Sequence, residues 1–527
     1  MKGLLINPVI PASFWSLKES VEVNGTKVLA PPLGLITMAA LLPPDWELRL
    51  ADLNARPMPA GAWDWADLVM ITGMLAQREG VLALVREAKA RGKSVVVGGP
   101  YANSLPEEVL DAGADFLFRG EAENTMPLFL AALEEGKKTG VFQSESRPAM
   151  TDSPVPRFDL LLREDYTVMS IQTSRGCPYD CEFCDVVHLY GRKPRYKKPE
   201  QVLEELAALY DLGWRQEIFI SDDNFIGNRQ HALAILDRLI PWMKSHGEPY
   251  GFWTQASVNL GQDQEMMDRM TAANFSFVFV GVESTDAVAL GLSRKYHNLR
   301  NPLAESLENL NKNGLSVVAS FIIGFDGEEK GAGERICDFV EELNIPMVMV
   351  NLLQAVPQTS LWRRLQEEGR LLEGSTASDI SSRGMNFIPT RPAGEIMEEY
   401  LQGTERLYEP TAYMNRAFQA ILRMRPTRRA LGQDENKGPT VPAPPDFRQK
   451  ITKSRGLAGL LKLIWRQGIR PPYRWQFWRQ LIGVIQKNPS RKIRYLNYCG
   501  LGESLFAYRR TVRKNLASTL RGSPLEG

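Results

Sequence analysis

The chain contains 527 residues, 44% of them hydrophobic and 24% charged, which is enough apolar material for several domains and excludes wholesale disorder. Its formal net charge is +1, yet residues 446–527 contain 18 Lys and Arg against only 3 Asp and Glu. The near-neutral net charge therefore conceals a strongly basic C-terminal region.

The first 140 residues alternate short β-branched segments with helical ones, which is typical of a parallel sheet covered by helices. The pattern predicts a doubly wound, Rossmann-like domain over residues 1–140, with strands at 3–6, 48–51, 68–72, 94–97 and 115–118. In such folds ligands bind beyond the C-terminal ends of the strands. No Gly-x-Gly-x-x-Gly sequence follows the first strand, so a nicotinamide dinucleotide site is not expected.

Residues 141–168 contain three prolines and are predicted to be a linker. A second series of strands and helices follows over residues 169–355, with strands predicted at 168–172, 217–221, 250–255, 277–282, 316–323 and 347–352. Six such repeats predict a partial (β/α)6 barrel, whose chemistry belongs on the loops after the strands. Beyond it we expect a helical extension at 356–424, a linker at 425–445 and a basic, aromatic-rich helical region at 446–527.

Three of the five cysteines, Cys177, Cys181 and Cys184, fall within eight positions directly after the first barrel strand. In a reducing compartment such clustering indicates a metal or catalytic site rather than disulfides. Each thiolate could hold one iron of a four-iron cluster, which would leave the fourth iron without a protein ligand. A structural zinc site completed by His188 is the alternative, although this cysteine spacing is unusual for zinc.

With Phe183 just before the third cysteine, the motif resembles that of the radical S-adenosylmethionine superfamily. The resemblance implies a [4Fe-4S] cluster whose open iron binds S-adenosylmethionine, which is cleaved to a 5′-deoxyadenosyl radical. Motifs at the later strand ends imply contacts with S-adenosylmethionine at Phe183, Asp222, Asp223, Gln255, Ser257, Gly281, Glu283 and Gly324. Each of these later motifs is weak alone; an Asp-Asp pair, for example, is commonly part of a turn or a helix cap. The resemblance to the superfamily rests on the order in which the motifs follow the cysteines along the chain.

A doubly wound domain ahead of such a barrel resembles the cobalamin-binding class of this superfamily. Several segments more narrowly resemble the subgroup that includes hopanoid C-methylases and tetraether-lipid ring synthases; they are 14–16, 31–35, 39–43 and 52–54. The resemblance implies cobalamin contacts at Pro32, Thr72, Gly73, Met74, Gly98, Gly99, Pro100, Arg119, Gly120 and Glu121. The alternative is that the glycines among them serve only tight turns.

The sequence lacks the Asp-x-His-x-x-Gly loop of many cobalamin proteins, because its first histidine is His188. Either cobalamin is bound without a histidine ligand or the domain has lost the cofactor, and we favour binding. We expect Glu121, Glu123 and Asp52 to be solvated or capping residues rather than acid or base catalysts.

The resemblance implies methylation of an unactivated carbon of a hydrophobic substrate, an isoprenoid lipid or a tetrapyrrole, with a flavodoxin or ferredoxin as reductant. The cofactors supply this chemistry, and the protein positions the reactants. A first alternative forms a ring or a carbon–carbon bond in a lipid without methyl transfer. RNA modification, as in methylthiotransferases, is disfavoured because those enzymes carry three further N-terminal cysteines, whereas Cys177 is the first cysteine here. A non-enzymatic adaptor with a structural cluster would not cleave S-adenosylmethionine.

Two segments of the basic region, 456–466 and 473–482, place Lys and Arg beside Trp, Phe and Leu, as interfacial helices do. Three interpretations remain, in order of preference: contact with an anionic membrane surface, internal packing of the aromatic side chains, and nucleic-acid binding. The N-terminus lacks the features of a signal peptide, and no stretch reaches the ~18 apolar residues of a spanning helix. We therefore expect a cytoplasmic protein with peripheral contact at the inner membrane face.

Overall fold

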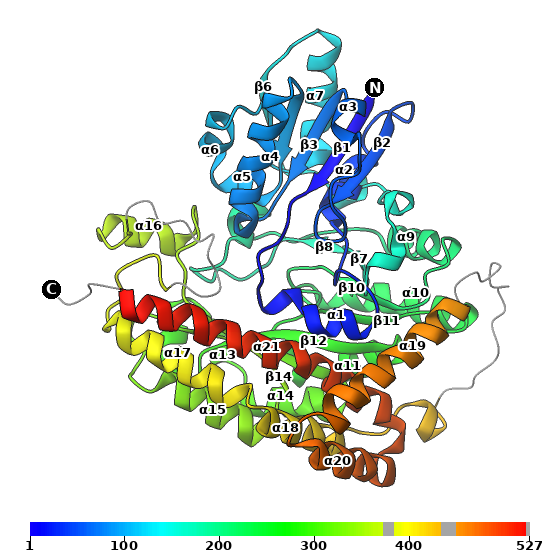
Figure 1. Ribbon diagram of the computed structural model, residues 1–527, viewed down its shortest axis with the longest axis vertical. Helices are drawn as coiled ribbons and strands as arrows, with labels where there is room; N and C mark the ends of the chain where they lie inside the picture. Colours follow the sequence, from blue (N-terminus) through cyan, green and yellow to red (C-terminus); the bar gives the residue numbers. More distant parts are fainter. Residues whose placement is uncertain (373–383, 434–448, 523–527) are drawn as a thin grey trace.

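A computed structural model describes residues 1–372, 384–433 and 449–522 of the chain. These residues form two six-stranded parallel sheets, one in the N-terminal domain and one in a partial barrel, with C-terminal helices beside the barrel (Figure 1). The predicted α/β fold class, with its doubly wound domain, partial barrel and helical C-terminal region, is confirmed.

The N-terminal sheet contains parallel strands in the order β2-β1-β3-β4-β5-β6. The five predicted strands are all present, with β1 to β5 at Lys2–Asn7, Glu47–Asp52, Leu68–Thr72, Ser94–Gly98 and Phe116–Arg119. Neighbouring residues such as Val69 and Met70 face separate cores, so the sheet is buried on both faces, which explains its continuous apolar runs. Helices cover these faces: α2 (Leu33–Ala39), α4 (Arg78–Ala90), α5 (Pro100–Ser104), α6 (Pro106–Asp111) and α7 (Ala122–Glu134).

The sixth strand, β6 (Gly140–Gln143), corrects the prediction that the linker begins at residue 141. It pairs with β5 at the edge of the sheet, and its Phe142 packs against Phe116 and Phe129. The strand is short and only Phe142 within it is buried, so its sequence carries no clear alternation. The rest of the predicted linker also contributes to the folded body, because Phe158 and Tyr166 are buried.

The barrel sheet runs in sequence order from β7 to β14, with every strand parallel. All six predicted strands are present, at β7 (Met169–Ile171), β10 (Glu217–Ile220), β11 (Gly251–Gln255), β12 (Phe275–Glu283), β13 (Ser316–Ile323) and β14 (Met347–Leu352). Strands β7 and β14 form the two edges and do not pair with each other, so the barrel is open between them. The outer helices are α9 (Pro199–Asp211), α10 (Arg229–Ser245), α11 (Gln264–Ala272), α14 (Leu303–Lys312) and α15 (Ala332–Leu343).

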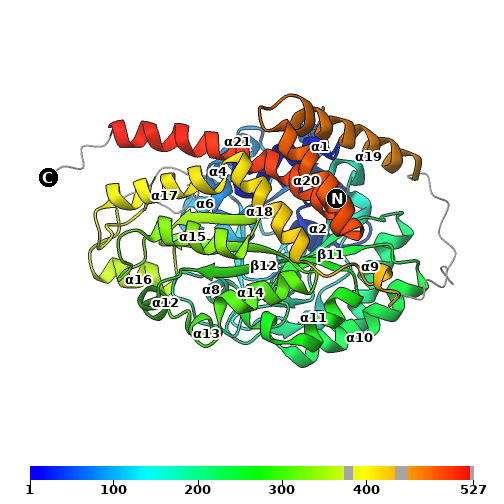
Figure 2. The same ribbon diagram turned by 90° about the horizontal axis from the view of Figure 1, so that it is seen from below.

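The C-terminal helices form a layer on one side of the barrel, opposite α10 and α11 (Figure 2). They are α17 (Ala393–Leu407), α18 (Pro410–Arg423), α19 (Gln449–Leu463), α20 (Arg474–Lys487) and α21 (Lys492–Gly522). The Tyr408 hydroxyl donates a 2.7 Å hydrogen bond to the backbone carbonyl of Val348 in β14, and Tyr413 donates one to Tyr498 in α21. Part of the basic region is therefore integral to the core.

Two observations bear on the expectations for the C-terminal half. The predicted linker at 425–445 contains a short helical turn at Arg429–Leu431, and its residues from 434 onward lie outside the described residues. Within the part of the chain that the structure describes, no helix combines the length and apolar character needed to cross a bilayer.

The contact between α15 and α17 allows a test of how the C-terminal layer is attached. A Cβ atom at Gly333 would lie 2.4 Å from the backbone oxygen of Glu399, whereas one at Gly394 would meet nothing within 4 Å. We predict that Gly333→Ala lowers the free energy of unfolding by about 1–3 kcal/mol through overpacking. Gly394→Ala should be neutral or stabilising by about 0.5–1 kcal/mol, because alanine favours helix. Equal denaturation midpoints for the two variants would contradict this packing.

Candidate functional site

The C-terminal ends of the two sheets face each other across a cavity of about 350 Å³. From the N-terminal sheet it is lined by six of the ten predicted cobalamin residues: Thr72, Gly98, Gly99, Pro100, Gly120 and Glu121. From the barrel it is lined by residues just after β7 and β10, namely Gln172, Arg175, Ser221 and Asp223. The cavity thus joins the predicted cobalamin crevice to the predicted S-adenosylmethionine end of the barrel.

Four predicted cobalamin residues, Pro32, Gly73, Met74 and Arg119, are not among the cavity-lining residues. Met74 turns outward and is exposed, and a Cβ at Gly73 would lie 2.5 Å from Val81, so this glycine serves packing. The sequence did not reveal the contribution of α2, which supplies Leu33, Gly34, Leu35, Thr37 and Met38 to the cavity. These residues carry no polar or strand-end signature, and only the fold brings them to the ligand crevice.

The alternative that the glycines serve tight turns applies to Gly99. This residue adopts φ +91°, and a Cβ there would lie 2.3 Å from the Thr72 hydroxyl. Gly120 has φ +104° with nothing within 4 Å of its Cβ position. Both glycines therefore permit backbone turns, and only Gly120 also leaves open space at the cavity wall.

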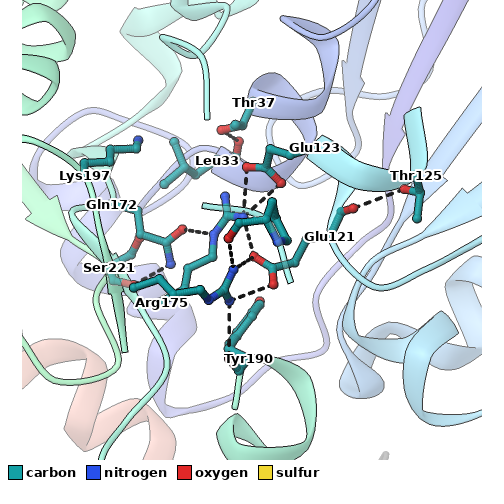
Figure 3. Close-up of polar contacts among 12 residues, drawn as sticks. Leu33, Thr37, Glu121, Glu123, Thr125, Gln172, Arg175, Tyr190, Lys197 and Ser221 are labelled. Carbon is teal, nitrogen blue, oxygen red and sulfur yellow. Dashed lines mark hydrogen bonds and ion pairs between the residues drawn. The ribbon is translucent and has the colours of Figure 1, made fainter. Parts of the chain in front are cut away.

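A buried ion-pair network joins the two domains at this cavity (Figure 3). The Arg175 guanidinium donates hydrogen bonds to the carboxylates of Glu121 at 2.8 Å and Glu123 at 3.0 Å, and Arg195 donates one to Glu121 at 2.7 Å. The side chains of Glu121 and Glu123 are only 6% and 4% exposed, so the prediction that they are solvated is wrong. Burial alone would raise the pKa of Glu123, but the charge of Arg175 outweighs it and lowers that pKa.

Asp52, the third carboxylate expected to be solvated, is also buried. It accepts hydrogen bonds from the Asn7 amide at 3.0 Å and from the Tyr166 hydroxyl at 2.9 Å. Asp52 therefore ties the end of β1 to the segment that leads into the barrel.

The cysteine loop begins at a small hairpin, β8 (Ser174–Arg175) with β9 (Arg195–Tyr196), which the sequence did not predict. Gly176 adopts φ +97°, and a Cβ there would lie 2.8 Å from the Gly191 carbonyl oxygen, so only glycine fits. Its N–H donates a 2.8 Å hydrogen bond to Asp223. The loop therefore leaves the hairpin in one defined direction.

Asp222 holds the start of this loop. Its fully buried carboxylate accepts four hydrogen bonds, from the backbone N–H and the hydroxyl of both Thr173 and Ser174, at 2.5–3.0 Å. A carboxylate has about four acceptor positions, so none is left for a ligand. The structure therefore gives Asp222 a positioning role, in place of the S-adenosylmethionine contact that the resemblance implied.

The three cysteines are free, partly buried thiols on one loop. Burial raises the pKa of each, to about 11 for Cys181, and a metal would bind these sulfurs as thiolates. Among the described residues, no three His, Cys, Asp or Glu side chains are placed to hold a single metal ion. One sulfur for each of three irons, as in a [4Fe-4S] cluster, fits this donor set.

Lys295 places a positive charge near the sulfurs of this loop, and the sequence did not single it out. Its ammonium group donates a 2.7 Å hydrogen bond to Glu283 at the end of β12 and lies 5.9 Å from the centre of the Phe183 ring. Burial would lower the pKa of Lys295, but the charges of Glu283 and Cys181 raise it. Glu283 adopts φ +66°, a strained conformation for a residue with a side chain, which this ion pair holds in place.

The other predicted S-adenosylmethionine residues lie at the same end of the barrel, on or after β11, β12 and β13. Ser257 is bound by Asn224, whose amide donates to the Ser257 hydroxyl at 3.1 Å. Asn224 directly follows the Asp222–Asp223 pair in sequence but was not among the predicted contact residues. A Cβ at Gly281 would lie 2.1 Å from the Glu283 carboxylate, so this glycine makes room for the ion pair. Gly324 adopts φ +105° beside Met385, and Phe183 packs against Phe325 at 5.6 Å.

Comparison with known proteins agrees with this geometry. The B12 binding domain family matches residues 23–130, the radical SAM superfamily matches 171–340, and a domain of unknown function matches 359–518. The chain is 44% identical to an uncharacterised methyltransferase of Synechocystis sp., over 99% of this chain and 94% of that protein. It is 34% identical to the hopanoid C-2 methylase of Rhodopseudomonas palustris, over 90% and 88% of the two chains. The chain belongs to the cobalamin-dependent radical S-adenosylmethionine methyltransferases.

Solved structures agree with the fold of this radical S-adenosylmethionine methyltransferase. The cobalamin-dependent radical enzyme OxsB with aqua-cobalamin bound has a TM-score of 0.59 at 15% identity, over 98% of this chain and 81% of that one. The methyltransferase TsrM of Kitasatospora setae has a TM-score of 0.59 at 16% identity, over 91% and 99%. The predicted cofactors of the methyltransferase, a [4Fe-4S] cluster, S-adenosylmethionine and cobalamin, are confirmed by its family.

We predict that Asp222→Asn reduces the iron and sulfide bound per chain several-fold after anaerobic reconstitution. The amide would direct N–H groups at donors of Thr173 and Ser174, and each unsatisfied buried group costs about 1–3 kcal/mol. Asp180→Asn is the matched control, because Asp180 lies within the cysteine loop itself and has only long ion pairs of 3.6 and 3.7 Å. Iron content equal to that of the unchanged protein in Asp222→Asn would contradict the positioning role.

Proposed function

We propose that this methyltransferase methylates an unactivated carbon of a bulky polycyclic isoprenoid lipid. The observation that carries the proposal is the position of the cysteine loop, which adjoins the interdomain cavity and is tied to it by Arg175. Support for the substrate class comes from the 34% identity to a hopanoid C-2 methylase over 90% of the chain. The relatives named bacteriochlorophyllide d methyltransferases are less similar, at 23% and 24% identity. A tetrapyrrole is therefore a less favoured substrate than an isoprenoid lipid.

In the proposed site, Cys177, Cys181 and Cys184 hold the cluster, and the cavity beyond β3, β4 and β5 holds the corrinoid. When bound, the cluster and the corrinoid supply reductive cleavage of S-adenosylmethionine and methyl transfer. The chain positions the cluster relative to the corrinoid. Arg175 ties the cysteine loop to Glu121 and Glu123, and both of these glutamates line the cavity.

The S-adenosylmethionine pocket is proposed at the ends of β10 to β13, with Asp223, Gln255, Ser257, Gly281, Glu283, Gly324 and Phe183 around it. Lys295 neutralises the Glu283 carboxylate and keeps a positive charge near the loop sulfurs. Because the Gly281 position has no side chain, the Glu283–Lys295 pair can lie flat against the strand. The electron donor is proposed to be a flavodoxin or a ferredoxin.

The function is tested with protein reconstituted anaerobically with iron, sulfide and cobalamin, S-adenosylmethionine carrying a deuterated methyl group, and a pentacyclic isoprenoid. We predict 5′-deoxyadenosine and a product carrying the labelled methyl group by mass spectrometry. Cys177→Ala, Cys181→Ala and Cys184→Ala should each abolish both products, whereas Cys337→Ala, at a buried cysteine of α15, should abolish neither.

Two results would contradict the proposal. Activity retained by a loop-cysteine variant would exclude this loop as the cluster site. Deoxyadenosine together with a ring-closed or coupled product that lacks the label would favour radical bond formation without methyl transfer.

We further propose that the basic region rests on an anionic membrane surface. One side of it packs inward, with Phe477 and Val484 fully buried, whereas Leu457, Leu461 and Trp465 are exposed beside Lys and Arg. Apolar and indole side chains next to cations suit the headgroup level of an anionic bilayer. Contact through this surface would place the protein at the inner membrane face. We do not propose that the basic region binds nucleic acid.

We predict that the double variant Leu461→Glu/Trp465→Glu sediments less with phosphatidylglycerol vesicles, because two carboxylates replace exposed apolar groups. Val288→Glu is the control, since Val288 is equally exposed but lies on α12 (Ala287–Leu292), away from the basic region. Deleting the region is unsuitable, because Tyr495 and Tyr498 are fully buried in the core. Unchanged sedimentation of the double variant would contradict the membrane contact.

A further inference from the structure

A second, larger cavity of about 1430 Å³ lies at the opposite end of the barrel from the cysteine loop. We call it the basal cavity, because it is lined by the first residues of barrel strands, such as Glu217 of β10 and Met347 of β14. Pockets of roughly 300–1,000 Å³ hold drug-sized ligands, so this one is large enough for a bulkier molecule. None of the roles proposed above uses it.

The wall of the basal cavity is rich in large apolar side chains, among them Trp15, Trp214, Trp253, Phe277 and Leu463. The ring of Trp15, from the N-terminal segment, lies 5.3 Å from the ring of Phe279 on β12, inside the open side of the barrel. These rings offer area and shape to a rigid hydrocarbon. The lining also includes charged residues such as Arg163, Asp211 and Arg215, which suit a polar end of such a molecule. Burial raises the pKa of Glu217, one of the carboxyl groups that line the cavity.

Two barrel strands lead from the basal cavity toward the proposed S-adenosylmethionine pocket. Trp253 lines the cavity, and the next inward-facing residue on β11 is Gln255, two positions or about 7 Å further along the strand. On β12, Phe277 lines the cavity, and Phe279, Gly281 and Glu283 follow it on the same inward side. A rigid molecule inserted from the base would therefore point its leading end at the cofactors.

We call the exposed side of the cavity along α19 its mouth; α1 (Lys18–Val23), α19 and α21 converge there beside the barrel (Figure 1). Gly456, Gly459 and Leu460 of α19 line the mouth, and the same helix carries the exposed side chains Leu457 and Leu461. A Cβ at Gly459 would lie 2.6 Å from the Val23 carbonyl oxygen, so this glycine lets α19 pack closely on α1. The opening is thus flanked by the surface proposed to contact the membrane.

We propose that the basal cavity binds the ring system of a polycyclic isoprenoid lipid, which enters from the membrane beside α19. The lipid passes through the base of the barrel, and its target carbon meets the cofactors from the side opposite the corrinoid domain. This inference rests on the proposed function for the identity of the occupant. It adds the route and the residues that select a rigid apolar shape.

Gly500 of α21 provides a way to fill this cavity without strain. It lines the basal cavity, and a Cβ there would meet nothing within 4 Å. Gly500→Phe therefore places a ring in the space of the ligand. Gly394→Phe is the matched control, because Gly394 is also a helical glycine with open space but does not line the cavity. Gly456→Phe, at the exposed mouth, is a second filling variant that leaves the buried core untouched.

The first test measures tritiated cholesterol, a tetracyclic isoprenoid, retained by reconstituted full-length protein after delivery from cyclodextrin and desalting. We expect saturable binding that is at least about tenfold weaker in Gly500→Phe and weakened in Gly456→Phe, with Gly394→Phe unchanged. Undiminished binding in both filling variants, or no saturable binding by the unchanged protein, would overturn the inference.

The second test separates the inference from the proposed function. Gly500→Phe should retain its iron, its corrinoid and its substrate-independent 5′-deoxyadenosine formation, while lipid methylation falls at least about tenfold. Methylation at the unchanged rate in Gly500→Phe would overturn the route and leave the proposed function standing. Cholesterol binding that responds to the filling variants, in a protein that methylates no lipid, would support the basal site and contradict the proposed function.

Discussion

The contact of Arg175 with Glu121 and Glu123 is the interaction on which the site depends. Arg175 lies two residues before Cys177, and both carboxylates come from the start of α7 in the other domain. Removing one partner of a buried ion pair leaves an unpaired charge and costs about 3–5 kcal/mol. The network is therefore favourable only when the two domains are docked, so domain docking and the position of the cysteine loop are coupled.

This coupling explains the arrangement of the two cavities. Domain docking covers the C-terminal end of the barrel and forms the small cavity next to the start of its cysteine loop. The open side of the barrel, between β7 and β14, is covered by α1 and by the C-terminal helices, which leave the large apolar cavity at the base. Cofactors and apolar substrate are thereby assigned to opposite ends of one barrel. The helices proposed to contact the membrane and the cysteine loop then lie on different surfaces of the barrel.

Much of the fold could be predicted from sequence because parallel strands buried on both faces give continuous apolar runs, as at Leu68–Thr72 and Ser316–Ile323. The edge strand β6 was missed because only its Phe142 is buried. The cysteine loop was found because its three ligands are local in sequence. Asp222 could be placed at the site but not given its role, because its four donors come from the preceding strand end, 48 and 49 residues away.

Other parts of the site depend on contacts that no local pattern records. Arg175 and Glu121 are 54 residues apart, and Lys295 reaches Glu283 from a neighbouring loop. In the basic region, composition predicted amphipathic helices but not that Tyr495 and Tyr498 are buried while Trp465 and Trp475 are exposed. Which face of such a helix packs inward is decided by its tertiary neighbours, since apolar residues occur all around it.

The central claim is that the interdomain cavity holds the corrinoid against the cysteine loop. Gly34 of α2 lines this cavity, and a Cβ there would meet nothing within 4 Å. The most direct measurement is the corrinoid and iron retained per chain by Gly34→Trp, compared with Gly394→Trp and the unchanged protein. The account predicts about one corrinoid per chain in the latter two and a large loss in Gly34→Trp with iron unchanged. Full corrinoid content in Gly34→Trp would contradict it.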